Sequence, residues 1–340
     1  MSTLVTGSAG FIGFHLSKRL LELGNKVIGL DSINNYYDIN LKLARINHLN
    51  DFSNKYSQEF NFVKSNIEDK ETLENIFKKF EIDTVINLAA QAGVRYSIDN
   101  PYAYMNSNLT GFGNILEACR NNNIKHLIYA SSSSVYGGNK KFPFSEKDSV
   151  DHPISLYAAT KKANELMAHT YSHLYGIPTT GLRFFTVYGP WGRPDMALFI
   201  FTKSIIENKP IKIFNHGNMK RDFTYIDDIV ESLIRVIKKV PKPNTEFNYE
   251  SPSLGASWAP YKVFNIGNSK PTPLMDFITA IEEKLGIESK KNYYDMQPGD
   301  VSCTAADTTA LEKWINFKPN TSVTKGISEF IDWYQDFYKC

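Results

Sequence analysis

A run of regularly spaced glycines near the first residue of the chain constrains its fold more than any other feature. The run reads Val5-Thr6-Gly7-Ser8-Ala9-Gly10-Phe11-Ile12-Gly13, between a predicted strand at residues 2–6 and an apolar helix pattern at residues 11–23. Gly7 permits a tight turn, Gly10 lets a pyrophosphate approach the backbone, and Gly13 lets the helix pack closely on the strand. The amides and positive dipole of the helix N-terminus would hold that pyrophosphate. The pattern predicts a dinucleotide-binding turn, with contacts from Gly7, Ala9, Gly10, Phe11, Ile12 and Gly13.

An acidic residue follows the second predicted strand, which spans residues 26–30. Asp31 stands 18 residues after Gly13, where turns of this kind carry a ribose-binding carboxylate. A carboxylate accepts hydrogen bonds from a ribose 2′-OH and repels a 2′-phosphate, so we expect NAD rather than NADP as the cofactor. Glycines also mark ordinary turns, and the strand, the helix and the acidic residue around them are what favour dinucleotide binding here.

Strand-like and helix-like segments alternate through the first half of the chain. Short apolar runs predict further strands at residues 60–64, 84–88, 126–130 and 178–183, and helical periodicity predicts helices at residues 69–80, 102–121 and 155–175. This alternation indicates βαβ units, and hence an α/β fold with a doubly wound parallel sheet of the Rossmann type. Ligands of such sheets bind beyond the carboxyl ends of the strands.

The alternation of strands and helices becomes less regular after Tyr188, which predicts that the chain folds into two domains. Residues 1–188 would form the NAD-binding domain, and residues 189–340 a smaller, mixed α/β substrate-binding part with some chain returning to the first domain. Helices are expected at residues 196–208, 273–285 and 324–338. A proline- and serine-rich stretch at residues 241–260 predicts an exposed excursion.

Composition narrows the possible partners. The 340 residues carry 38 basic and 36 acidic side chains, a net charge of +2, which argues against nucleic acid as the main partner. We find no signal-peptide pattern and no apolar run long enough to cross a bilayer, so no membrane partner is expected. Cys119, Cys303 and Cys340 have no C-x-x-C spacing; they predict free thiols in a reducing cytoplasm, and no metal site is expected.

A tyrosine and a lysine four residues apart lie in the helix predicted at residues 155–175. On a helix, Tyr157 and Lys161 share a face, so the phenol and the ammonium project into the same space. A free tyrosine has a pKa near ~10 and is a poor base at neutral pH. A lysine and an oxidised nicotinamide nearby would favour the phenolate. Taken alone, this spacing fits an amphipathic helix equally well.

Four serines follow the strand predicted at residues 126–130. The segment reads Ala130-Ser131-Ser132-Ser133-Ser134-Val135-Tyr136-Gly137, so its hydroxyls lie at the carboxyl edge of the sheet. The plain interpretation is a solvated serine loop. In a sheet of this type, the same position faces the nicotinamide side of the ligand crevice.

Together, T-G-x-x-G-x-x-G, S-S-x-x-V-Y-G and Y-x-x-x-K resemble the motifs of the extended short-chain dehydrogenase/reductase family. The chain resembles its NAD-dependent nucleotide-sugar epimerases, and among them most the UDP-glucuronate 4-epimerases. Matching segments cover nearly the whole length and include residues 31–38, 87–95, 185–194, 221–228 and 296–301. The resemblance implies that Ser132, Tyr157 and Lys161 are catalytic, with Ser133 as the alternative to Ser132.

The resemblance also implies roles for residues outside these motifs. Asn66 and Ile67 would contact adenine, Ala89 and Ala90 would let the dinucleotide lie close to the backbone, and Asn108 would brace the sheet edge. Arg221 and Asp300 would hold the UDP phosphates and ribose, while Arg193 and Thr186 would face a sugar carboxylate, to which a guanidinium can bond through both oxygens. The implied cofactor-binding set includes Asn34, Asn66, Ile67, Ala89, Ala90, Gln91, Asn108, Tyr157 and Lys161, and the substrate-binding set Gln91, Arg95, Ser132, Ser133, Thr186, Arg193, Arg221 and Asp300.

The implied reaction is reversible C4 epimerisation of a UDP-sugar, UDP-glucuronate to UDP-galacturonate, through a 4-keto intermediate. Tyr157 would take the 4-OH proton while C4 gives hydride to NAD; the keto sugar would turn over and take the hydride back on its other face. For Arg193, a surface ion pair is the alternative interpretation. Relatives of this kind pair the helices predicted at residues 102–121 and 155–175, which implies a homodimer.

Other activities remain open at this stage. UDP-glucuronate decarboxylases and nucleotide-sugar 4,6-dehydratases carry acidic residues just before V-Y-G, where this chain has Ser133 and Ser134. A UDP-glucose or UDP-N-acetylhexosamine 4-epimerase would use identical chemistry and differ only in pocket contacts. A non-catalytic NAD-binding sensor would typically lack the Tyr-Lys pair, which is present here.

Overall fold

The computed structural model describes residues 1–297 and 299–340. Pro298, which belongs to the segment 296–301 used for the resemblance, lies outside the described residues.

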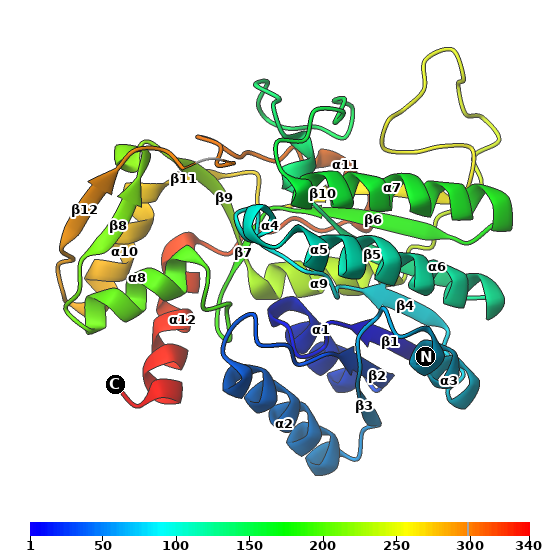
Figure 1. Ribbon diagram of the computed structural model, residues 1–340, viewed down its shortest axis with the longest axis horizontal. Helices are drawn as coiled ribbons and strands as arrows, with labels where there is room; N and C mark the ends of the chain where they lie inside the picture. The colour runs from blue at the N-terminus through cyan, green and yellow to red at the C-terminus, as the bar shows by residue number, and fades with distance from the viewer. Residues whose placement is uncertain (298) are drawn as a thin grey trace.

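A seven-stranded parallel sheet forms the centre of the protein (Figure 1). Its strand order is β10-β6-β5-β4-β1-β2-β3, and every neighbouring pair is parallel. This confirms the predicted α/β, Rossmann-type fold. The strands are β1 (Ser2–Thr6), β2 (Lys26–Asp31), β3 (Phe60–Lys64), β4 (Thr84–Asn87), β5 (His126–Ser132), β6 (Thr179–Phe184) and β10 (Tyr261–Ile266).

Helices cover both faces of this sheet, because its strands are short apolar runs that must be buried on both sides. One layer contains α1 (Phe11–Glu22), α2 (Ile39–Tyr56), α9 (Ile226–Ile237) and α11 (Thr309–Ile315). The other contains α3 (Lys70–Lys79), α5 (Pro101–Tyr104), α6 (Phe112–Asn121) and α7 (Leu156–Tyr175) (Figure 1). The helix predicted at residues 102–121 is helical throughout, but its Met105–Gly111 turns are a π-helix, labelled η1.

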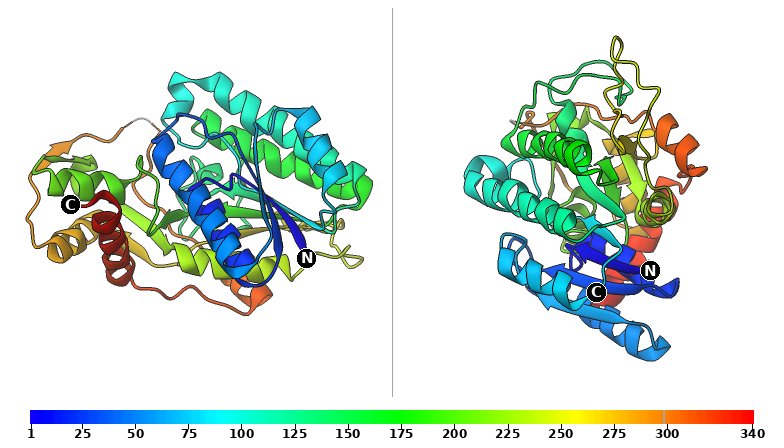
Figure 2. Two further views of the ribbon diagram at one scale, coloured as in Figure 1. Left: turned by 90° about the horizontal axis from the view of Figure 1, so that it is seen from below. Right: turned by 90° about the vertical axis from the view of Figure 1, so that its right-hand side faces the viewer.

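Two small sheets and three helices lie at the end of the molecule remote from the N-terminus (Figure 2). One sheet joins β7 (Thr186–Tyr188), β9 (Lys220–Tyr225) and β11 (Pro271–Pro273); the other joins β8 (Ile211–Phe214) and β12 (Lys291–Tyr294). The helices are α8 (Ala197–Ile206), α10 (Leu274–Leu285) and α12 (Val323–Tyr338). Strand β10 and helices α9 and α11, also from beyond residue 188, belong to the large sheet and its layers.

Of the predicted exposed excursion at residues 241–260, residues 242–254 are almost all exposed and belong to the long loop projecting at the upper right of Figure 1. Ser257, Ala259 and Pro260 are buried where the chain returns to β10. Across the described residues, we find no helix whose length and apolar character would let it cross a membrane.

Candidate active site

A cavity of about 1360 Å³ opens at the carboxyl edge of the large sheet, between it and the small sheets. Pockets for one small molecule measure roughly 300–1,000 Å³, so this one has room for two ligands. Nearly all of the predicted site residues line it: Gly7, Gly10, Phe11, Ile12, Gly13, Asp31, Asn34, Asn66, Ile67, Ala89, Ala90, Gln91, Arg95, Ser132, Ser133, Tyr157, Lys161, Thr186, Arg193, Arg221 and Asp300.

The glycine-rich turn has no space for side chains. Gly7 has a φ of +72°, and a Cβ there would lie 2.9 Å from the Ala89 nitrogen. A Cβ on Gly13 would lie 2.1 Å from the Gly7 carbonyl oxygen, and one on Gly10 would lie 2.9 Å from the same atom. The bare backbone therefore forms a cradle at the N-terminus of α1, which suits an anionic diphosphate.

Asp31 ends β2 at the cavity wall. Its Oδ2 accepts a hydrogen bond from the Ala9 amide (3.0 Å), and its Oδ1 accepts one from the Ile33 amide (2.9 Å). Ala9 itself is fully buried and does not line the cavity, because its amide already serves Asp31. The Ala9 amide orients the Asp31 carboxylate. The direct contact from Ala9 to the cofactor stays a prediction.

Asn108, in the π-helix η1, also lies behind the cavity wall rather than on it. Its Oδ1 accepts from the Gln91 amide (2.8 Å), and its Nδ2 donates to the Gln91 carbonyl (3.1 Å) and to Thr160 Oγ1 (3.0 Å). The Asn108 carbonyl accepts from Asn164 Nδ2 (2.7 Å). Asn108 thus links the segment after β4 to α7, as expected of a residue that braces the sheet edge. Its contact with the cofactor stays a prediction.

Tyr157 and Lys161 lie one turn apart on α7, whose first turn is capped by Ser155: the Ser155 hydroxyl accepts from the Ala158 amide (3.1 Å). Lys161 Nζ donates to the Ala130 carbonyl at the end of β5 (2.7 Å). Burial lowers the pKa of Lys161 to about 8. The ammonium is therefore still mostly charged at neutral pH.

Burial raises the pKa of the Tyr157 phenol, while a hydrogen bond from Ser132 and the positive charge of Arg193 lower it. Ser132 and Arg193 thus add to the lowering that the sequence expects from Lys161 and an oxidised nicotinamide. Ser132 Oγ also accepts from the Ser134 amide (3.1 Å), which fixes its rotamer. Of the two candidate serines, Ser132 is the one that lowers the pKa of the phenol. Which of the two acts in the reaction stays a prediction.

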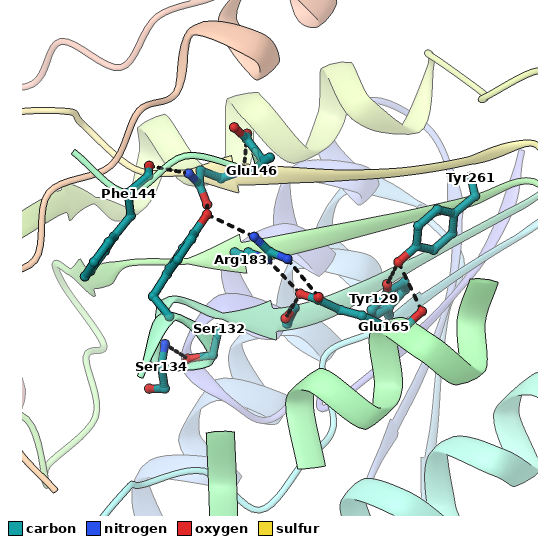
Figure 3. A network of polar contacts seen from close by, with 11 residues as sticks. Tyr129, Ser132, Ser134, Phe144, Glu146, Glu165, Arg183 and Tyr261 are labelled. Atoms are coloured by element: carbon teal, nitrogen blue, oxygen red, sulfur yellow. Dashed lines mark hydrogen bonds and ion pairs between the residues drawn. The ribbon is translucent and has the colours of Figure 1, made fainter. Parts of the chain in front are cut away.

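A buried polar network supports these groups from behind (Figure 3). Arg183 on β6 donates from Nε and Nη2 to the two carboxylate oxygens of Glu165 on α7 (2.8 and 2.9 Å). Ser131 donates to Glu165 (2.7 Å), and Arg183 Nη1 donates to the Tyr136 hydroxyl (3.0 Å). Because both partners of the ion pair are nearly inaccessible to water, removing either would leave an uncompensated buried charge. The network therefore holds the end of β5, and with it Ser132, against α7.

Arg193 lines the cavity and is paired within the protein. Its Nε donates to Asp195 Oδ1 (3.0 Å) and its Nη2 to Asp195 Oδ2 (2.5 Å), while the Tyr36 hydroxyl donates to the same Oδ2 (3.2 Å). Among the described residues, Arg193 Nη1 has no hydrogen-bond partner. Asp195 therefore fixes one edge of the guanidinium and leaves the Nη1 edge for a ligand.

Arg95, Asp300 and Arg221 meet at the far end of the cavity. Arg95 Nη2 forms an ion pair with Asp300 (2.7 Å), and its guanidinium lies 5.1 Å from the centre of the Phe214 ring. Arg221 Nη1 donates to the Lys220 carbonyl (2.9 Å) and the Ser302 carbonyl (3.3 Å). Two guanidiniums, one carboxylate and an aromatic ring thus lie together, a set that suits an anionic nucleotide.

The sequence gives no role to several cavity residues. Tyr36, Lys42 and Asp195 line the cavity but were not identified as site residues. Lys42 belongs to α2, which the sequence does not predict, and donates to the Asn34 carbonyl and side chain (2.7 and 2.6 Å). Asp195 could have been identified from the sequence, because an acidic residue two positions after Arg193 can form a local ion pair with it.

Replacing Asp31 with Ala is expected to weaken NAD binding and to improve NADP binding relative to the wild type. The variant loses both the acceptor for the ribose hydroxyl and the charge that repels a 2′-phosphate. Asp31→Asn is the matched control, since it removes the charge and keeps a side-chain acceptor for the Ile33 amide. Fluorescence titrations with both cofactors measure the effect, and an unchanged NAD/NADP ratio in both variants would contradict the assignment.

Comparison with known proteins agrees with this geometry. The model of the NAD dependent epimerase/dehydratase family matches residues 3–249. Protein CapI of Staphylococcus aureus is 57% identical over 339 residues, covering 100% of both chains.

A probable UDP-glucuronate 4-epimerase of Rhizobium meliloti is 47% identical over 340 residues, covering 100% of this chain and 98% of the relative. Among solved structures, UDP-glucuronic acid 4-epimerase from Bacillus cereus in complex with UDP-glucuronic acid and NAD is similar with a TM-score of 0.86. It is 32% identical in sequence, and the match covers 99% of this chain and 100% of that one.

Proposed function

Because the chain belongs to the NAD dependent epimerase/dehydratase family, we propose that it inverts C4 of a UDP-sugar with NAD as a retained cofactor, converting UDP-glucuronate to UDP-galacturonate. The observation that carries the proposal is one cavity that holds Tyr157, Lys161 and Ser132 between the glycine-rich turn and Arg193. The names of the R. meliloti and B. cereus proteins support the activity.

The residues at the sheet edge fit NAD. A Cβ at Gly7, Gly10 or Gly13 would collide with the backbone of the turn or of the segment after β4, so only glycines allow this tight turn at the N-terminus of α1. Asp31 lines the same cavity and would bind the adenosine ribose. Bound NAD supplies a reversible acceptor for the C4 hydride. The contribution of this chain is to hold that cofactor through the whole cycle and to move the proton.

Tyr157, as the phenolate, is the final acceptor of the proton of the sugar 4-hydroxyl. Ser132 relays it: its hydroxyl gives its own proton to the phenolate and takes the proton of the 4-hydroxyl. Lys161, anchored on the Ala130 carbonyl, is charged at neutral pH, and its charge favours the phenolate. After the 4-keto sugar has turned over in the cavity, Tyr157 returns the proton. The stereochemistry at C4 is thereby inverted without net oxidation.

At the other end of the substrate, Arg221 and Asp300 bind the UDP phosphates and ribose, and Arg193 and Thr186 hold the uronate carboxylate. The free Nη1 edge of Arg193 supports this role, because a guanidinium can bond Asp195 on one edge and a second carboxylate on the other. A 4-keto uronate is a β-keto acid, and a fixed carboxylate resists the geometry in which it would lose carbon dioxide.

A panel of UDP-sugars tests the substrate. Incubation with UDP-glucuronate, UDP-glucose, UDP-N-acetylglucosamine and UDP-galacturonate, with products resolved by NMR, should give C4 inversion of the two uronates in preference to the neutral sugars. Preference for UDP-glucose or UDP-N-acetylglucosamine would replace the proposal with a neutral-sugar epimerase. UDP-xylose as the main product would indicate a decarboxylase. If no sugar gave a product, the chain would be a binding protein rather than an enzyme.

We also propose a cytoplasmic homodimer, paired through the helices at residues 101–121 and α7. Tyr102 and Met105 on the first of these and Leu166 and Leu174 on α7 are exposed apolar side chains, which such an interface would bury. Light scattering coupled to size exclusion distinguishes a dimer from a monomer, and Leu166→Glu with Leu174→Glu should shift the mass to that of one chain.

A further inference from the structure

Three consecutive carbonyls in the loop before Arg193 are bound by side chains from the NAD-binding layer. His15 Nε2 on α1 lies 2.9 Å from the Pro190 oxygen, and because a carbonyl only accepts, the ring must carry its proton on Nε2. Arg45 Nη2 on α2 donates to the Trp191 oxygen (2.5 Å) and the Gly192 oxygen (3.3 Å). The next residue is Arg193.

Arg45 is a buried cation that forms no ion pair within the described part of the chain. It is 0% exposed, and its remaining Nη1 contacts are the Ala9 carbonyl (2.8 Å) and the Tyr37 hydroxyl (2.8 Å). A buried charge without a carboxylate partner is costly, so an ordinary packing role would be served better by an apolar side chain. The arginine instead joins the glycine-rich turn, at Ala9, to the loop that carries Arg193.

The backbone of this loop is strained where Arg45 binds it. Trp191 has a φ of +59°, the left-handed region that bulky residues rarely adopt. Its ring packs against Phe14 on α1 and against Trp333 and Phe337 on α12. Such a conformation persists only where the surroundings determine it strongly, which the bound carbonyls and the packed ring do here.

His15 serves as a neutral donor. Its ring packs edge-on against Phe11 and Phe14, and burial lowers its pKa to about 3. Its hydrogen bond to Pro190 therefore does not change over the pH range in which an enzyme is assayed.

We propose that His15 and Arg45 are positioning residues that fix the loop 189–192, and through it Arg193, so that the preference for a carboxylated UDP-sugar depends on them. The inference rests on the proposed function, since it assigns the origin of substrate choice at the same site. Asp195 positions the guanidinium of Arg193 and is itself held by the Tyr36 hydroxyl (3.2 Å), whereas His15 and Arg45 hold the backbone that leads into Arg193.

The test compares Arg45→Met and His15→Phe, which keep the bulk of the side chains and remove the donors. Kinetics at saturating NAD are measured with UDP-glucuronate and with UDP-glucose, and calorimetry measures UDP-glucuronate binding to the NAD-loaded protein. Each variant should raise KM and Kd for UDP-glucuronate about tenfold, which corresponds to about 1.4 kcal/mol. KM for UDP-glucose should change little. Because the charge of Arg193 lowers the pKa of Tyr157, any change in kcat should be the same for both sugars. His15→Gln, which retains a donor, should restore most of the UDP-glucuronate affinity.

A second measurement separates the two residues. Because only Arg45 also contacts Ala9, Arg45→Met should weaken NAD binding in a fluorescence titration, whereas His15→Phe should not. Arg19→Met is the matched control, as Arg19 lies on α1 in an exposed pair with Glu22; it should leave all of these values unchanged.

The outcomes distinguish the two proposals. A wild type that prefers UDP-glucose overturns the proposed function. A wild type that prefers UDP-glucuronate, with variants that are folded by circular dichroism and change KM for both sugars equally or for neither, overturns the positioning role. If Arg45→Met does not fold, His15→Phe and His15→Gln decide the question alone.

Discussion

Replacing Tyr157 with Phe is expected to abolish nearly all turnover while NAD stays bound. Phe keeps the ring and its packing but removes the group that accepts the 4-hydroxyl proton. The loss of general base catalysis should lower kcat by on the order of 10²–10⁴. Because the substitution leaves the glycine-rich turn and Asp31 unchanged, the NAD content of the purified protein should match that of the wild type.

Tyr171→Phe is the matched control for this experiment. Tyr171 lies on the same helix, but its hydroxyl donates to Glu117 on α6 and the residue does not line the cavity. Removing that hydroxyl tests whether any change in the polar surface of α7 affects the rate. A Tyr157→Phe enzyme with kcat within tenfold of the control would show that another group accepts the proton.

The large sheet was predictable because its signals are local. The glycine-rich turn identifies β1 and α1 together, and the short apolar runs that follow end at the strand boundaries within a few residues. Helix α2 was missed for a physical reason: its buried face includes Lys42 and Arg45 beside Leu41, Ile46 and Leu49. Those two charged side chains interrupt the apolar periodicity on which the prediction of a helix depends.

The three residues that we propose as catalytic could be identified for a similar reason. Tyr157 and Lys161 lie one helical turn apart, and Ser132 follows a strand directly, so short spacings in the sequence suffice to identify them. The choice between Ser132 and Ser133 depends on which hydroxyl reaches the phenol, and that follows only from how β5 packs against α7.

Contacts between residues far apart in the chain could not be predicted from the sequence. Asp195 accepts from Tyr36, which comes 159 residues earlier, and Arg45 binds Trp191, 146 residues later. The Arg183–Glu165 pair likewise forms only because β6 and α7 pack together. No periodicity encodes such contacts, and a buried arginine appears in the sequence as an ordinary surface charge.

The Arg193→Ala variant is expected to lose affinity for UDP-glucuronate but not for neutral UDP-sugars. A desolvated carboxylate left without its charged partner costs roughly 2–5 kcal/mol, which is a tens- to thousands-fold rise in KM. UDP-glucose presents no carboxylate to Arg193, so its KM should change little. Arg193→Lys keeps the charge but cannot bond Asp195 and a ligand on two edges at once, so its KM for UDP-glucuronate should fall between those of the wild type and the alanine variant.

The same variant should also change the product. Without Arg193, the carboxylate of the 4-keto intermediate is held loosely and can reach the geometry in which it leaves as carbon dioxide, so NMR should detect some UDP-pentose. Loss of Arg193 also frees Asp195, whose negative charge then faces the uronate directly and adds repulsion that a neutral hexose does not experience. The ratio of the two KM values is therefore the decisive measurement. A variant that affects UDP-glucuronate and UDP-glucose equally would mean that Arg193 serves only its ion pair with Asp195, and the uronate specificity would have to come from another part of the cavity.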